Sequence, residues 1–196
     1  MHLPLDPATV VRVGIDGTWH PPTIELARGL ALLPGSFNPL HIGHRELARI
    51  AASILDRDVA FEISIANVDK PPLDAAVVNE RLAQFHGQAD VWLTHAPRFA
   101  EKAVRFPGST FVVGADTALR IVSTRYYGND DRRMIEALEA IESRSCRFLL
   151  ACRVDSAGRL LRLEDVPIPV AFRGLFAEIP PEQFRWDISS TELRAT

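Results

Sequence analysis

The chain has 196 residues, of which 47% are hydrophobic and 24% charged, and its formal net charge is -3. This length suffices for one sizeable core, and the lack of a basic surplus argues against a nucleic-acid partner. No stretch approaches the about 20 consecutive apolar residues that span a bilayer, and the N-terminus MHLPLDPATVV lacks a secretory signal pattern. We therefore expect a cytoplasmic protein that acts on small molecules away from membranes, with its oligomeric state left open.

The first 29 residues consist of extended pieces interrupted by turns. VRVGI (11–15) is followed by Asp16 and Gly17, a pair typical of hairpin turns, and then by a stretch with two prolines. This pattern predicts an N-terminal arm or hairpin over residues 1–29, followed by one domain over residues 30–196.

From residue 30 onward, strand-like and helix-like patterns alternate. An apolar run at 30–33 leads into a loop, and the residues after it, to position 54, carry apolar side chains at helical spacing. We expect further strands at 59–65, 91–93, 110–113, 147–151 and 160–163, helices at 75–85, 98–105 and 134–142, and a proline-punctuated connection at 167–181. The alternation predicts an α/β protein with a Rossmann-like open parallel sheet and helices on both faces.

The loop after the first of these strands has the sequence GSFNPLHIGH (35–44). Gly35 lets the backbone approach a phosphate closely, and a loop between a buried strand and a helix is the usual anion-binding geometry of an open parallel sheet. His41 and His44 are three residues apart, so they share one face of the first helical turn. Isolated histidines more often cap a helix or lie in solvent, but this placement favours hydrogen bonds to phosphoryl oxygens.

Two further segments carry polar residues at element ends. FVVGADT (111–117) places a glycine and an aspartate after a strand, and ISSTELR (188–194) places serines at a helix start. Taken alone, the first is an ordinary turn and the second an ordinary helix cap.

Together, the three segments resemble a known family. GSFNPLHIGH is similar to the signature of the HxGH nucleotidyltransferase superfamily, with its cytidylyltransferase-like fold, and ISSTELR matches the second signature. FVVGADT resembles the GxD element of the nicotinate and nicotinamide mononucleotide adenylyltransferases. The resemblance runs from about residue 30 to residue 194.

The resemblance implies direct attack of an acceptor phosphate on the α-phosphorus of a nucleoside triphosphate, without a covalent enzyme intermediate. His41 and His44 would be catalytic, Asp116 would hold ribose hydroxyls, and the 189–194 segment would bind the β and γ phosphates. The implied nucleotide-binding residues are Gly35, Ser36, Phe37, Gly114, Asp116, Ser189, Ser190, Thr191 and Arg194.

The donor implied by the resemblance is ATP with Mg²⁺, and the acceptor is nicotinate or nicotinamide mononucleotide. Such adenylyltransferases commonly have a tryptophan soon after the GxD element, whereas this chain continues ALRIVSTRYYG. An aromatic platform from Tyr126, Tyr127 or Trp92, and a cation from Lys70, are the expected acceptor contacts. We expect no protein-bound metal site, because Cys146 and Cys152 have no neighbouring histidine.

Two alternative functions stay open. A cytidylyltransferase that uses CTP and an alcohol phosphate shares the HxGH pattern, although GADT is not specifically expected there. A non-catalytic sensor could retain the nucleotide pocket without turnover. A class I aminoacyl-tRNA synthetase, which also carries HIGH, is disfavoured by the short chain, the missing KMSKS-like loop and the negative charge.

Overall fold

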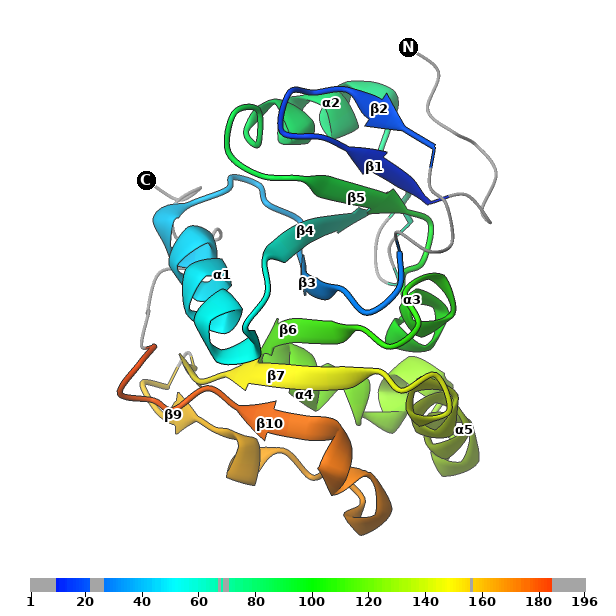
Figure 1. Cartoon of the computed structure of the whole chain (residues 1–196). Coiled ribbons are helices and arrows are strands. Elements are labelled where there is room, and N and C mark those ends of the chain that lie inside the picture. The colour runs from blue at the N-terminus through cyan, green and yellow to red at the C-terminus, as the bar shows by residue number, and fades with distance from the viewer. Residues whose placement is uncertain (1–9, 22–26, 67, 69–70, 156, 185–196) are drawn as a thin grey trace.

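The computed structural model describes residues 10–21, 27–66, 68, 71–155 and 157–184 (Figure 1). Its strands are β1 (Val11–Val13), β2 (Trp19–His20), β3 (Ala31–Pro34), β4 (Val59–Ser64), β5 (Val91–Thr94), β6 (Thr110–Gly114), β7 (Arg147–Ala151), β8 (Arg153–Val154), β9 (Leu160–Leu161) and β10 (Phe176–Glu178). Its helices are α1 (Ile42–Leu55), α2 (Ala75–Ala83), α3 (Phe99–Arg105), α4 (Ala115–Ile121) and α5 (Asp131–Glu142), with the 3-10 segments η1 (Thr124–Tyr127), η2 (Leu163–Asp165) and η3 (Val170–Leu175). Within the described residues, no helix is long and apolar enough to cross a membrane.

The main sheet has the strand order β10-β7-β6-β3-β4-β5-β1-β2. Strands β10 through β5 in this order are parallel, and the hairpin β1–β2 adds to the β5 edge in antiparallel orientation. The chain builds outward from β3 to β4 and β5, then returns to place β6 on the other side of β3. The carboxyl ends of β3 and β6 therefore form the topological switch point, where ligands of open α/β sheets bind.

Helices cover both faces of this sheet. Successive strand residues point to opposite faces, so Leu32 joins the core cluster that includes α3, α4 and α5, whereas Leu33 joins the cluster that includes α1 and α2. The predicted Rossmann-like open sheet with helices on both faces and an N-terminal hairpin is thereby confirmed (Figure 1).

The C-terminal part of the fold differs from the sequence-based expectation. The region expected as a connection at 167–181 contains η3 and the strand β10, which pairs with β7. Its prolines concealed a strand of only three residues, whose Phe176 ring stacks on Phe148 at a centroid distance of 4.7 Å. The strand expected at 160–163 is shorter and pairs with β8 in a separate hairpin.

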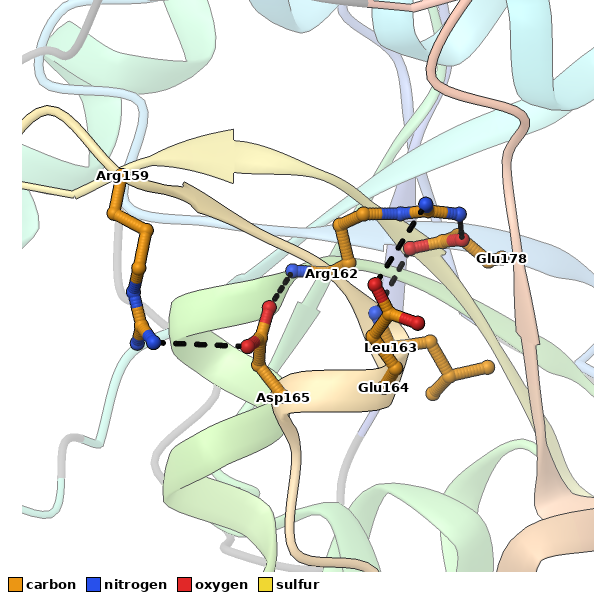
Figure 2. Close-up of polar contacts among 6 residues, drawn as sticks. All are labelled: Arg159, Arg162, Leu163, Glu164, Asp165 and Glu178. Carbon is orange, nitrogen blue, oxygen red and sulfur yellow. Dashed lines mark hydrogen bonds and ion pairs between the residues drawn. The ribbon is translucent and has the colours of Figure 1, made fainter.

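A network of charged side chains fastens the β8–β9 hairpin to β10 (Figure 2). Arg162 Nη2 donates to Glu178 Oε2 at 2.8 Å, and the Leu163 amide donates to Glu178 Oε1 at 2.8 Å. Asp165 accepts from the Arg162 amide at 2.9 Å and lies 3.7 Å from Arg159. These contacts fix the hairpin whose first strand begins with Arg153, next to the end of β7.

Candidate functional site

The loop between β3 and α1 folds back on itself over Phe37. A Cβ atom on Gly35 would lie 2.7 Å from Phe37 Cζ, so only glycine fits beneath the ring. Phe37 has a positive φ of 44°, which is rare for a bulky residue. Its ring is 1% exposed and contacts Phe61 and Phe85 edge-on at centroid distances of 5.3 and 5.2 Å. Packing of the ring thus holds the backbone in its unusual conformation.

The Gln84 side chain, directly after α2, fixes the middle of the same loop. Its Nε2 donates to the Phe37 carbonyl at 3.0 Å, and its Oε1 accepts from the Leu40 amide at 2.7 Å. Both ends of one amide are therefore used to set the path of the chain before the histidines.

His41 and His44 lie together at the start of α1. Their rings are stacked with a centroid distance of 3.8 Å, and the His44 ring meets Phe37 edge-on at 5.0 Å. The His41 amide donates to His44 Nδ1 at 3.3 Å. Because Nδ1 accepts, the proton of neutral His44 is on Nε2, which can donate to a ligand.

Both imidazoles favour the neutral form. Burial, with smaller contributions from His41 and Arg153, lowers the pKa of His44 from 6.5 to about 3. Burial and then Arg153 also lower the pKa of His41. At neutral pH the two side chains therefore offer N–H donors without adding net charge.

The lowered pKa of His44 predicts a loss of stability in mild acid. The folded state resists protonation of a group that ordinarily titrates at 6.5, so its contribution is complete above pH 6.5 and is lost as the pH falls toward 3. In urea unfolding at pH 7, 6 and 5, we expect the free energy of unfolding of the parent to fall more steeply than that of His44→Gln, by at most about 1.4 kcal/mol per pH unit. The exposed His86→Gln is the control. Parallel profiles for the parent and His44→Gln would contradict the assignment.

The end of β6 supplies a carboxylate. Gly114 is the N-cap of α4, and a Cβ on it would lie 2.7 Å from Asp116 Oδ1, so the glycine lets this side chain fold back over the strand end. Asp116 lies in the first turn of α4, where a loop was expected. Its Oδ2 is 3.6 Å from Arg153 Nη1, and its side chain is 41% exposed. A partly exposed carboxylate in this position can accept hydrogen bonds from ribose hydroxyls.

A cavity of about 460 Å³ lies at the carboxyl ends of β3 and β4. Gly35 and Ser36 line it on the loop side, and Tyr126 and Tyr127 of η1 line it elsewhere. Tyr127 is anchored, since its hydroxyl donates to the Ile121 carbonyl at 2.9 Å. A ligand in this cavity would lie beside Gly35 and Ser36, at the start of the histidine loop (residues 35–44).

Other side chains expected at the site lie elsewhere or outside the described residues. Trp92 is 3% exposed, faces Arg12 of β1 in the sheet register and packs edge-on against Phe106, away from the 460 Å³ cavity. Trp92 is therefore not brought to this cavity. Lys70, Ser189, Ser190, Thr191 and Arg194 lie outside the described residues.

Several polar residues of the site were not predicted from the sequence. Among them are Gln84, Arg153, Glu62 and Lys102. Glu62 and Lys102 did leave a signal, because each interrupts an apolar pattern, the first within VAFEIS and the second between Phe99 and Phe106. Gln84 and Arg153 left none, since their positions depend on contacts between segments distant in sequence.

Paired histidines at a helix start, beside the switch point of an open parallel sheet, form an arrangement that can bind phosphorylated ligands. The sequence model described as cytidylyltransferase-like matches residues 32–196. The chain belongs to the cytidylyltransferase-like family, and this membership supports nucleotidyltransferase activity. No curated protein matches the chain.

Proposed function

We propose that the protein is an adenylyltransferase that transfers AMP from ATP to nicotinate or nicotinamide mononucleotide and releases pyrophosphate. The observation that carries this proposal is that the loop leading to two stacked, neutral imidazoles lines, through Gly35 and Ser36, the same cavity as Tyr126 and Tyr127. The imidazoles suit a triphosphate, and the tyrosines suit a flat ring.

In the proposed reaction, a phosphate oxygen of the acceptor attacks the α-phosphorus of ATP. The new P–O bond forms as the bond to pyrophosphate breaks. Because the attacking phosphate is already ionised, no base is needed to remove a proton from it. His44 Nε2–H and the His41 ring donate to the phosphoryl oxygens, on which charge increases in the transition state. The Ser36 and Phe37 backbone borders the nucleotide, and Asp116 binds its ribose.

Further contacts complete the proposed substrate complex. The serines and Arg194 of the 188–194 segment bind the β and γ phosphates, and Mg²⁺ enters with the triphosphate as part of the substrate. Tyr126, which shares the cavity lining with Tyr127, provides the stacking surface for the acceptor ring. Arg153, 3.6 Å from Asp116, lies on the nucleotide side of the site and adds positive charge there.

A pyrophosphate-release screen with Mg²⁺ tests the proposal. The screen crosses ATP and CTP with nicotinate mononucleotide, nicotinamide mononucleotide, phosphopantetheine, glycerol phosphate and choline phosphate. We expect turnover with ATP and a pyridine mononucleotide, because only these acceptors combine a phosphate with a ring for the tyrosines.

Other outcomes of the screen replace the proposal. Turnover confined to CTP and an alcohol phosphate assigns the chain to the cytidylyltransferases that act on such acceptors. Nucleotide binding measured by calorimetry, without pyrophosphate release from any pair, assigns it a sensor role.

A further inference from the structure

A buried ion pair lies on the wall of the 460 Å³ cavity and has no role in the reaction described above. Glu62 of β4 is 0% exposed and Lys102 of α3 is 4% exposed, yet both line the cavity. Lys102 Nζ donates to both carboxylate oxygens of Glu62 at 2.7 Å. Removing two charges from water costs desolvation free energy, and a buried ion pair often adds little net stability. Its position at the cavity wall therefore suggests a role in ligand binding.

The hydrogen bonds of Glu62 fix the position of the Lys102 ammonium group. Its Oε1 also accepts from the Thr94 hydroxyl at 2.6 Å, and Thr94 Oγ1 in turn accepts from the Ala96 amide at 3.1 Å. An ammonium group has three N–H donors, and the hydrogen bonds of Lys102 to the described residues go to Glu62 alone. One donor is therefore left for a ligand in the cavity.

The remaining charges of the cavity wall have one sign. Arg81, Arg98 and Arg120 also line it, whereas Glu62 is the one acidic residue among the described lining. Ser64 Oγ, which lines the same cavity, is buried and has no hydrogen-bond partner among the described residues. The wall therefore offers donors and positive charge to a group that the acceptor carries in addition to its phosphate.

From this arrangement we infer that Lys102, oriented by Glu62 and Thr94, binds a carboxylate on the acceptor and makes the enzyme select an acid over the corresponding amide. The inference rests on the proposed function, because it places the acceptor in this cavity. A carboxylate accepts a charge-assisted hydrogen bond from the remaining N–H of Lys102, whereas a carboxamide offers this ammonium group only a neutral carbonyl oxygen.

Calorimetry without ATP tests this selection, with nicotinate mononucleotide and nicotinamide mononucleotide as probes. We expect the parent to bind the acid at least about tenfold more tightly than the amide, the effect of ~1.4 kcal/mol. The double variant Lys102→Gln/Glu62→Gln removes both charges while keeping polar groups at both positions, and it should lose this preference with ATP affinity unchanged. Glu101→Gln, on the exposed side of the same helix, should keep it.

Several results overturn the inference. The inference is overturned if the parent binds acid and amide equally, or if it binds neither probe. It is also overturned if the double variant keeps the preference for the acid. Selective binding of the acid with no pyrophosphate release upon adding MgATP instead supports the binding role of Lys102 while refuting the proposed reaction.

Discussion

Alanine in place of His41 or His44 is expected to lower kcat about 100-fold or more, the scale measured when a preorganised donor to a developing oxyanion is lost. The His44 Nε2–H is set by the hydrogen bond from the His41 amide to Nδ1, so its direction is fixed before the substrate binds. Steady-state pyrophosphate release with the best substrate pair measures the effect. His44→Gln, which retains an N–H donor, should lose less activity than His44→Ala.

The exposed His86→Ala, which lies outside the histidine loop, should retain the parental kcat. Unfolding curves of each variant separate catalytic loss from loss of fold. If a folded His44→Ala protein turned over at the parental rate, the donor role of this side chain would be refuted.

Removing the cation of the buried pair is expected to have the largest effect on stability. Lys102→Met leaves the Glu62 carboxylate buried with Thr94 as its remaining side-chain partner among the described residues. Breaking such a pair typically costs about 3 to 5 kcal/mol of unfolding free energy. The double variant Lys102→Met/Glu62→Leu removes the orphaned charge and should recover most of this loss. Urea unfolding at neutral pH measures both.

An exposed ion pair of similar length provides the contrast. Arg49 lies 2.6 Å from Glu46 on α1, but its side chain is 67% exposed, so Arg49→Ala should change stability little. A Lys102→Met protein as stable as the parent would show that leaving the buried Glu62 carboxylate without its cation costs little unfolding free energy, contrary to this prediction.

The order and type of most elements could be predicted because the spacing of apolar residues along the sequence indicates which faces of a helix or strand are buried. Strand β3, with Leu32 and Leu33 entering opposite cores, reads as a continuous apolar run, and α1 reads as an amphipathic helix. Strand β10 could not be recognised, since a strand of three residues is too short to show a hydrophobic periodicity. Helix α4 was also missed, because Gly114 and Asp116 have the composition of a turn although they begin a helix here.

The site divides in the same way. His41, His44 and Asp116 stand within local sequence patterns, and local patterns can be read without a structure. Gln84 and Arg153 reach the site from α2 and β8, so their contribution depends on how distant segments pack. Trp92 shows the converse, because an aromatic residue suited to stacking is instead held in the core by Phe106.

The central position of β3 has a consequence for the timing of folding. Its residue Ala31 pairs with Val59 of β4 on one side and with Thr110 of β6 on the other. Because β6 lies much later in the sequence than β4, the ribosome synthesises it later. Proteins are synthesised from the N-terminus, and the histidine loop therefore emerges long before β6 can support it. Until then one edge of β3 stays open to pairing with other chains. A fragment that ends before residue 110 would contain both histidines but only half of the switch point.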